Sequence, residues 1–287
     1  ILYVSSVYDG DFGGMFTTKD QGITWVLSAS QKALLDRNVI SLAVAPTDPQ
    51  KLFAGTYDGL LQTTDGGKRW SLVSGPEELR GKIYDVSFSD PDTVYAATGN
   101  GLFESEDRGA TWRKNEAAEV RTAVYKVSAA PGNRSLILAQ TSRGVLLSQD
   151  RGTAWRLLNP GADQLAVYDF SFGAGKQAGM FMATSRGLIY SDDAGWHWHS
   201  IAGGLPLFPV QQIVLPRDRP QEVYALSRTG NQIWRSIDAG ATWLAVDNSG
   251  LEGASLLSLG VADEQLFAVT ENYGVFRLDA ATVADAP

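Results

Sequence analysis

A repeated eight-residue stretch decides the fold, and one complete copy reads Ser105-Glu106-Asp107-Arg108-Gly109-Ala110-Thr111-Trp112. The shared pattern is Ser/Thr-x-Asp-x-Gly-x-x-Trp, which we call the Asp–Trp motif. Its six complete copies begin at Thr18, Thr63, Ser105, Ser148, Ser191 and Ser236. Recurrence at a nearly constant spacing is the sequence signature of a repeat architecture. We therefore expect a chain built from similar units.

The spacing of the copies predicts the size of each unit. Successive motif aspartates are 45, 42, 43, 43 and 45 residues apart, and they are Asp20, Asp65, Asp107, Asp150, Asp193 and Asp238. A period of about 40–45 residues suits a four-stranded propeller blade. A further interval of 41 residues leads to Asp279, where Ala281 and Ala284 replace the expected Gly and Trp. We interpret this segment as a degenerate seventh copy.

Each period contains four strand-like pieces, which in one unit lie at residues 39–44, 51–56, 59–64 and 69–73. The second and third pieces are joined by a Gly-containing turn such as Tyr57-Asp58-Gly59, and the Asp–Trp motif joins the third and fourth. Gly permits the positive φ that tight hairpin turns require. The sequence predicts an all-β fold, a seven-bladed β-propeller of four-stranded antiparallel blades.

The whole chain, residues 1–287, is expected to form a single propeller domain. It starts in a second-type strand at Leu2 to Val7 and ends after a third-type strand, so blades 1 and 7 are expected to be incomplete. The chain begins at Ile1 without Met, which suggests that a signal segment or an upstream domain has been removed.

The motif residues are expected to hold the turn together rather than to perform chemistry. A carboxylate can accept hydrogen bonds from turn N–H groups, a hydroxyl can lock the loop, and an indole can cover the hairpin with apolar area. The motif tryptophans are Trp25, Trp70, Trp112, Trp155, Trp198 and Trp243. We expect no metal and no catalysis at these repeated positions.

The Asp–Trp motif resembles the Asp box of the bacterial neuraminidase repeat (BNR) families. These include sialidases, sortilin-type receptors, xyloglucanases and photosystem II assembly-factor propellers, and the resemblance extends over essentially the whole chain. Sialidases typically carry an Arg-Ile-Pro motif near the start, but this chain lacks that motif and has no Arg through Trp25. The resemblance therefore implies Asp-box hairpins and argues against a sialidase.

The other families of this group match the chain to different extents. Xyloglucanases generally join two propellers and place catalytic aspartates between them, whereas this chain has the length of one. Sortilin-type receptors use a larger ring followed by Cys-rich modules, and this chain contains no Cys. Assembly-factor propellers match best in size and blade number. That resemblance implies a non-catalytic, protein-binding role outside the cytoplasm.

Composition removes several functional classes. The net charge of −8 opposes a general attraction to nucleic acid or to anionic lipid, since polyanion binding relies on clustered Lys and Arg. No apolar run approaches the length of about 20 residues that a membrane-spanning helix needs, so no membrane insertion is expected. Phosphate-loop, dinucleotide, zinc-protease and nucleophile-elbow patterns are absent from the sequence. We predict no cofactor.

One polar column is expected along the first strands, and it consists of Ser41, Asp85, Lys126, Asp169, Gln212 and Ser258. Tyr84, Tyr125 and Tyr168 directly precede three of its members. Asp85 and Asp169 could form the carboxylate pair that glycoside hydrolysis requires. The favoured alternative is an ion-paired ring in which Lys126 sits between them, because buried carboxylates usually need such partners.

A second candidate is a group of arginines. Arg143, Arg186 and Arg228 occupy the same type of turn in three consecutive units, and Arg121 is expected nearby. Guanidinium groups suit the recognition of carboxylate or phosphate, as on an acidic partner surface or an anionic sugar. Solvated turn arginines are the favoured alternative, since exposed charges usually contribute little.

The remaining candidates receive structural interpretations. His197 and His199 are the only histidines and flank Trp198, so we expect an exposed structural pair, because a metal site would need further ligands. Asn133-Arg134-Ser135 fits a glycosylation acceptor, but this tripeptide is common and we assign it no function.

The sequence predicts a non-catalytic binding or assembly propeller in an extracytoplasmic compartment, whether periplasmic, lumenal or secreted. Antiparallel connections alternate ends, so the Gly turns and the long crossovers at 74–81, 115–121 and 202–209 should share the rim opposite the motifs. Variable loops on a rigid scaffold usually carry function, so we expect this rim to meet a protein or glycan partner. One alternative is a glycoside hydrolase-like enzyme, and another is a module of a larger cell-surface receptor. The sequence leaves catalysis open.

Overall fold

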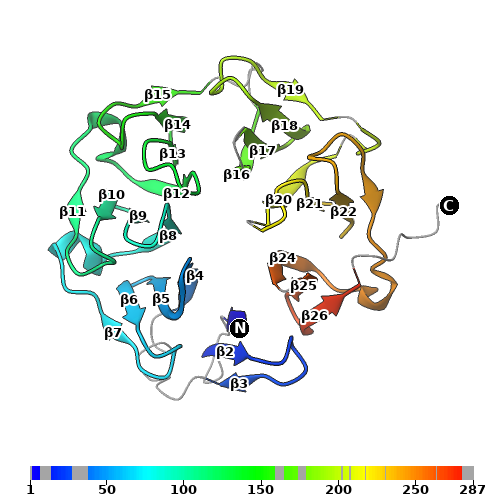
Figure 1. The fold of residues 1–287 in the computed structure, drawn as a ribbon, viewed down its shortest axis with the longest axis horizontal. Coiled ribbons are helices and arrows are strands. Elements are labelled where there is room, and N and C mark those ends of the chain that lie inside the picture. The colour runs from blue at the N-terminus through cyan, green and yellow to red at the C-terminus, as the bar shows by residue number, and fades with distance from the viewer. Residues whose placement is uncertain are drawn as a thin grey trace. The chain divides into compact units, whose positions relative to one another are not determined.

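The computed structural model describes residues 2–6, 14–27, 38–158, 165–173, 179–201, 203–206, 208–216, 218–229, 231–262 and 264–279. Within these ranges the chain forms seven antiparallel sheets in sequence order and almost no helix. Every sheet pairs each strand with the next one along the chain (Figure 1). The predicted fold class is confirmed, since the chain is an all-β, seven-bladed propeller of four-stranded antiparallel blades.

Blades 1 to 4 belong to one compact unit, Ile1–Leu157. Blade 1 contains β1 (Leu2–Ser6), β2 (Gly14–Thr18) and β3 (Val26–Leu27). Blade 2 contains β4 (Val39–Ala45), β5 (Asp48–Thr56), β6 (Gly59–Thr63) and β7 (Ser71–Leu72). Blade 3 contains β8 (Ile83–Phe88), β9 (Val94–Thr98), β10 (Gly101–Ser105) and β11 (Arg113–Lys114). Blade 4 contains β12 (Val124–Ala129), β13 (Ile137–Thr141), β14 (Gly144–Ser148) and β15 (Arg156–Leu157).

Blades 5 to 7 belong to a second compact unit, Leu158–Pro287. Blade 5 contains β16 (Val167–Phe172), β17 (Met180–Thr184), β18 (Gly187–Ser191) and β19 (His199–Ser200). Blade 6 contains β20 (Val210–Val214), β21 (Val223–Ser227), β22 (Ile233–Ser236) and β23 (Leu244–Ala245). Blade 7 contains β24 (Leu256–Ala262), β25 (Gln265–Thr270) and β26 (Gly274–Leu278). Among the described residues, three short 3-10 helices lie in the crossovers: η1 (Glu77–Arg80), η2 (Ala118–Val120) and η3 (Ser249–Leu251).

The terminal sheets are smaller than the others. Among the described residues blades 1 and 7 have three strands each, whereas the other five blades have four. Val7, Ala281 and Ala284 lie outside the described residues, and so does the degenerate seventh motif beyond Asp279. Because the chain divides into two compact units, a single domain over residues 1–287 stays a prediction.

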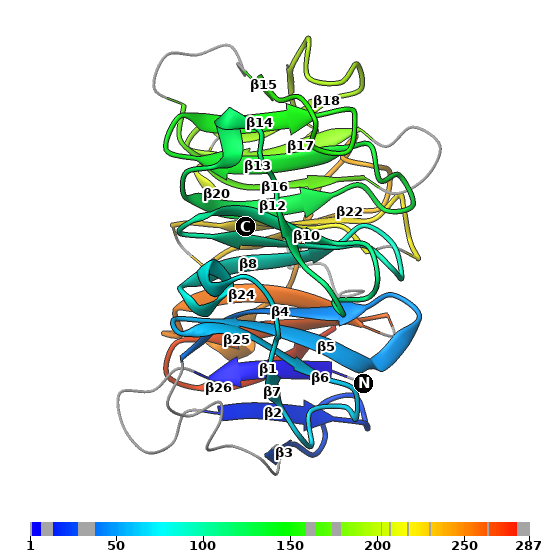
Figure 2. The ribbon, with the colours of Figure 1, turned by 90° about the vertical axis from the view of Figure 1, so that its left-hand side faces the viewer.

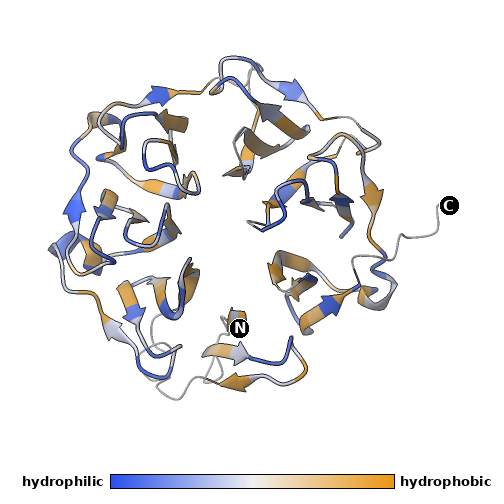
Figure 3. Ribbon diagram, viewed as in Figure 1, coloured by the Kyte–Doolittle hydropathy of each residue, from blue (hydrophilic) through white to orange (hydrophobic). Residues whose placement is uncertain are grey.

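The hydrophobic core lies between neighbouring sheets. Phe53 of β5 is fully buried, and its ring centroid lies 5.8 Å both from that of Phe88 in blade 3 and from that of Trp112, the latter in an edge-to-face arrangement. Within the first unit, β8 lies between β4 and β12 in both views (Figures 1 and 2). Hydrophobic colouring marks many of the strands, and several connecting turns are hydrophilic (Figure 3). Within each unit, neighbouring blades are thus stabilised by burying apolar side chains against one another.

The two kinds of connection lie at opposite ends of a sheet. At one end, the N–H of Gly66 in the second motif donates to the carbonyl oxygen of Gln50 in β5, at 3.0 Å. At the other end, the backbone of the crossover that contains Leu79 packs against Gly59, close to the turn between β5 and β6. We call these ends the motif end and the Gly-turn end.

The described part of the chain contains no helix that is long and apolar enough to cross a membrane.

Candidate functional site

The Asp–Trp motif closes its turn with a dense set of hydrogen bonds. In the third copy the Ser105 hydroxyl donates to Asp107 Oδ1 at 2.7 Å and accepts the N–H of Gly109 at 2.7 Å. Asp107 also accepts the N–H of Thr111 at 2.8 Å and its hydroxyl at 2.6 Å. The Trp112 indole donates to the carbonyl oxygen of Gly109 at 3.2 Å. The Ser, Asp and Trp side chains that define the motif are therefore engaged within the motif itself.

These hydrogen bonds keep the motif aspartates ionised. In three copies the pKa of the carboxyl is lowered to about 2, namely in Asp20, Asp107 and Asp238. The largest cause in each is a hydrogen bond from the hydroxyl of the Thr four residues after the Asp. A carboxylate that already accepts several turn donors has little capacity left for a substrate. Within the described ranges, no group of three or more potential metal-ligating side chains is present.

His197 takes the place of that Thr in the fifth motif. Its backbone N–H donates to Asp193 Oδ1 at 2.9 Å, and its Nδ1 lies 2.5 Å from Asp193 Oδ2. Two hydrogen bonds from His197 hold the pKa of Asp193 well below the usual range. The one from its backbone N–H has the larger effect, and the one from its ring is next. His197 and His199 are both exposed. The contacts of His197 are those of a turn residue.

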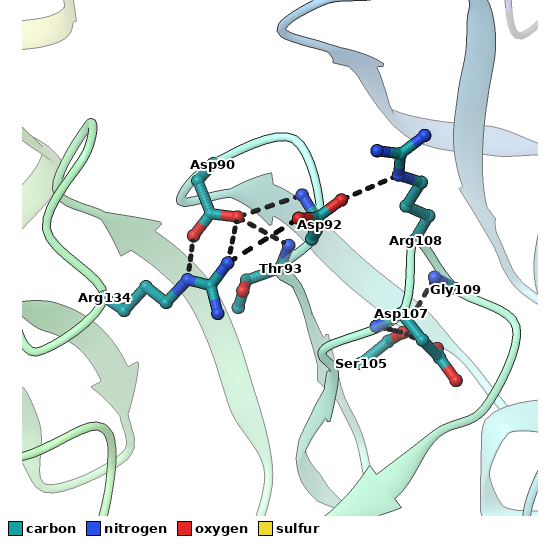
Figure 4. Close-up of polar contacts among 8 residues, drawn as sticks. All are labelled: Asp90, Asp92, Thr93, Ser105, Asp107, Arg108, Gly109 and Arg134. Carbon is teal, nitrogen blue, oxygen red and sulfur yellow. Dashed lines mark hydrogen bonds and ion pairs between the residues drawn. The ribbon is translucent and has the colours of Figure 1, made fainter.

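An ion-pair cluster joins blades 3 and 4 at the motif end (Figure 4). The Arg134 guanidinium donates to both carboxylate oxygens of Asp90, from Nε at 2.6 Å and from Nη2 at 3.0 Å. Asp92 accepts Arg108 Nε at 2.7 Å. Arg134 belongs to the Asn133-Arg134-Ser135 tripeptide, whose Asn133 is exposed and accepts the N–H of Ser135 at 3.0 Å. At this end, Arg134 joins blade 4 to blade 3, and the Arg108–Asp92 pair braces blade 3 itself.

The polar column joins the first strands of neighbouring blades. In the first unit Asp85 accepts the Ser41 hydroxyl at 3.0 Å, the N–H of Val86 at 2.9 Å and the N–H of Val127 in β12 at 3.1 Å. Burial raises the pKa of Asp85, and the charge of Lys126 opposes that rise. Asp85 therefore links blade 3 to its neighbours on both sides.

The same arrangement recurs in the second unit. Asp169 is 6% exposed and accepts the N–H of Phe170 at 2.7 Å and of Ile213 in β20 at 2.8 Å. Gln212 donates to the carbonyl oxygen of Leu259 at 3.3 Å and accepts its N–H at 2.6 Å. Each of these side chains satisfies backbone groups of the next blade. The two candidate catalytic carboxylates, Asp85 and Asp169, are thus engaged by backbone amides, each in its own unit.

A row of aromatic and cationic side chains lies at the Gly-turn end of blades 2 to 4. We call Tyr57, Lys82, Tyr84 and Tyr125 the tyrosine row. The Lys82 ammonium lies 4.3 Å from the ring centroid of Tyr57 and 4.8 Å from that of Tyr84. The Tyr84 and Tyr125 centroids are 5.3 Å apart, with the ring planes at 72°. The structure thus brings together two predicted residues, Tyr84 and Tyr125, and adds two that were not predicted.

The tyrosine row has open surface and unused donors. The exposed fractions of Tyr57 and Tyr125 are 45% and 42%, and Tyr84 and Lys82 are half-buried. In the described part of the chain, the three hydroxyls make no hydrogen bond and the Lys82 ammonium makes no ion pair. Such surface polar groups remain available to a partner.

The predicted arginines have different surroundings. Arg121 and Arg143 belong to the first unit and Arg186 to the second, and all three are exposed. The Arg228 guanidinium, also exposed, lies 4.4 Å from the ring centroid of Tyr168. The structure therefore pairs one predicted arginine with one predicted tyrosine. All four arginines are surface groups, and the stripe stays a prediction.

Tyr57 and Lys82 were missed because they do not share a position in the repeat. Tyr57 lies in a Gly turn and Lys82 ends a crossover, so alignment of first strands does not bring them together. A second missed feature had a clear signal. Thr-x-x-Gly recurs at Thr56, Thr98, Thr141 and Thr184, and each Thr hydroxyl donates to the carbonyl oxygen of the Gly.

Comparison with solved structures shows related folds at low identity. YCF48 bound to D1 peptide matches with a TM-score of 0.71 and 17% identity over 95% of this chain and 87% of that chain. YCF48 from Cyanidioschyzon merolae matches with a TM-score of 0.62 and 18% identity over 85% and 83% of the two chains. No protein-family model matches this sequence, and neither does any curated protein.

Two larger proteins contain a similar fold. An ancestral GH74 enzyme matches with a TM-score of 0.66 and 17% identity, over 84% of this chain and 36% of that chain. The extracellular domain of the one-component system BT4673 from B. thetaiotaomicron matches with a TM-score of 0.65 and 15% identity, over 85% and 32%. The chain spans about a third of each. Identities at this level show the shared propeller fold.

Proposed function

We propose that this chain is a non-catalytic binding or assembly propeller whose Gly-turn end in blades 2 to 4 meets a protein partner. The tyrosine row carries this proposal. It combines two exposed aromatic rings with a lysine that has no ion-pair partner among the described residues. Aromatic side chains with polar tips are typical anchors of protein interfaces, because they bury a large area at a low entropic cost.

The opposite end of the same blades supports this division of roles. There the motif aspartates, the Arg134–Asp90 pair and the Arg108–Asp92 pair are used in contacts within and between blades. The similar structure described as YCF48 bound to D1 peptide supports a protein partner for this fold. The extracellular BT4673 domain supports a place outside the cytoplasm. We further propose that the Asp–Trp motifs are Asp boxes of the BNR type.

A glycoside hydrolase is the second candidate, favoured by the similarity to a GH74 enzyme. Its proposed carboxylates would be Asp85 and Asp169. Both already accept backbone N–H groups of a neighbouring blade, and this arrangement supports a structural role for them. A role as one module of a larger receptor agrees with the binding proposal. The matched propeller covers only 32% of the BT4673 chain, so a similar fold occurs there as part of a longer protein.

A photo-crosslinking comparison tests the binding proposal. We expect benzoylphenylalanine at Ser142, in an exposed Gly turn, to give discrete adducts with proteins from the source cells, and benzoylphenylalanine at Ala110, in an exposed motif turn, to give none. Tyr57→Ala combined with Tyr125→Ala should remove the adducts formed at position 142. Adducts of equal strength at both positions would contradict the proposal. The proposal would also be contradicted if the purified chain cleaved xyloglucan and if Asp85→Asn abolished this cleavage without unfolding the protein.

A further inference from the structure

We propose that the tyrosine row recognises an extended, proline-rich segment that carries acidic side chains. This inference rests on the proposed function and names the chemistry of its partner. Three properties of the row support it, namely its ring surfaces, its hydrogen-bonding groups and its charge.

The first property is a series of ring surfaces at one end of three successive blades. Tyr57 lies in blade 2, Tyr84 in blade 3 and Tyr125 in blade 4, and Lys82 bridges the first two rings. The Tyr84 and Tyr125 rings meet nearly edge to face, at 72°, so they present surfaces of different orientation. Proline-rich segments in the polyproline II conformation dock on such aromatic-lined surfaces, because the pyrrolidine rings pack flat and the chain loses little entropy.

The second property is a set of hydrogen-bond donors without partners. The row offers three phenol hydroxyls and one ammonium, and none of them has a hydrogen-bonding or ionic partner in the described part of the chain. An ammonium can only donate. A proline residue presents a carbonyl acceptor and no N–H, so a proline-rich segment matches this inventory.

The third property is the charge of Lys82. Its ammonium is held over two rings, at 4.3 and 4.8 Å, and forms no ion pair among the described residues. Glu77 and Glu78 in the preceding crossover are exposed and make no ion pair with it. A cation fixed in this way favours a carboxylate in the partner, because attraction between complementary charges steers and orients binding.

Peptide binding to the full chain tests this inference. The probe is a fluorescein-labelled peptide of repeated Pro-Pro-Glu triplets, followed by fluorescence anisotropy. Two matched peptides replace every Pro by Ala or every Glu by Lys. We expect saturable binding of the first peptide and binding at least about tenfold weaker for the other two, the difference that one aromatic anchor or one complementary charge typically gives.

Variants of the protein locate the binding surface. Tyr57→Ala and Tyr125→Ala should each weaken binding by about tenfold, as truncation of an interface anchor does. Lys82→Ala should remove the preference for Glu over Lys in the peptide, and Lys82→Arg should keep it. Tyr273→Ala is the matched control, since Tyr273 is 64% exposed in the corresponding turn of blade 7 and lies outside the row. Thermal unfolding of each variant verifies that it is folded.

Several outcomes would overturn the inference. They are the absence of binding up to millimolar peptide, equal binding of the Ala-substituted peptide, and equal losses in Tyr273→Ala and Tyr125→Ala. Binding of xyloglucan oligosaccharides instead of the peptide would also overturn it. If crosslinking at position 142 depends on Tyr125 while the peptides do not bind, this inference fails and the proposed function stands. If crosslinking at position 142 does not depend on Tyr125 and the peptides do not bind, both this inference and the proposed function fail.

Discussion

Single residues in the Asp–Trp motif adopt an unusual backbone conformation. The residue after the Asp has a positive φ in all six copies, and in five of them it is not Gly: Gln21, Arg108, Arg151, Ala194 and Ala239, with φ between 57° and 63°. The motif Gly follows with a positive φ as well. At Gly109 an added Cβ would lie 2.2 Å from Phe53 Cζ, so this position requires Gly for space as well as for φ.

The non-Gly position offers a stabilising substitution. Ala239 has φ 57° on an exposed turn, a conformation that costs an L-residue with a Cβ about 1 kcal/mol. Ala239→Gly relieves this cost but also raises the entropy of the unfolded chain. The net result should be a free energy of unfolding that is higher by about 0.5–1 kcal/mol. Urea denaturation measures this change. Ala241→Gly in the same exposed turn is the control and should destabilise, because the φ of Ala241 is not positive.

At the scale of elements, one irregularity shapes the first strands of blades 2 to 7. The register shifts at the second residue of each strand, as between Ile83 and Asp85, and the skipped residues are Ile40, Tyr84, Tyr125, Tyr168, Gln211 and Leu257. A bulge of this kind re-aims side chains at the end of a strand. Two of the skipped residues, Tyr84 and Tyr125, belong to the tyrosine row, and the polar residues that bind the next blade directly follow the shift.

The Gly turns depend on a buried hydroxyl. The Thr98 side chain is fully buried, donates to the carbonyl oxygen of Gly101 at 2.8 Å and accepts the N–H of Asn100 at 3.0 Å. Thr98→Val keeps the shape but leaves these backbone groups unpaired, which should cost about 1–3 kcal/mol of unfolding free energy. Thr98→Ser retains the hydroxyl and should lose less. Equal stability of the Val variant and the original protein in urea denaturation would refute this role.

At the scale of the whole molecule, the motif aspartates predict the response to acid. Asp20, Asp107 and Asp238 have a pKa of about 2, lowered mainly by the neighbouring Thr hydroxyls. A lowered pKa in the folded state stabilises it above the unfolded value of about 4, and this stability is lost as the pH falls toward about 2. The pKa of Asp85 is raised by burial and acts in the opposite sense, since the folded state takes up that proton first.

Urea midpoints measured from about pH 7 to about pH 2 at constant ionic strength test this expectation. The midpoint should change little above about pH 4 and fall steeply below it. Asp107→Asn should flatten the fall, because one of the titrating groups is gone. A midpoint that stays constant or rises over the same range would show that the three aspartates do not carry this stability.

The sequence by itself determined the all-β class, the number of blades and the two kinds of hairpin turn. These features come from contacts between residues close in the chain, as in the eight residues from Ser105 to Trp112, so a local pattern repeated six times reveals them. The sequence also found Tyr84 and Tyr125, because they share a position in the repeat.

Only the tertiary structure decided what the candidate site residues contact. Tyr57, in a turn of blade 2, meets Lys82 at the end of the crossover that leads to blade 3, and Asp85 binds the amide of Val127, 42 residues away. Such contacts depend on strand twist, on the bulges and on how far each side chain reaches. The spacing of the motifs predicts none of these. The column of aspartates suggested catalysis as well as ion pairing, and the backbone amides of the neighbouring blades gave those carboxylates their partners.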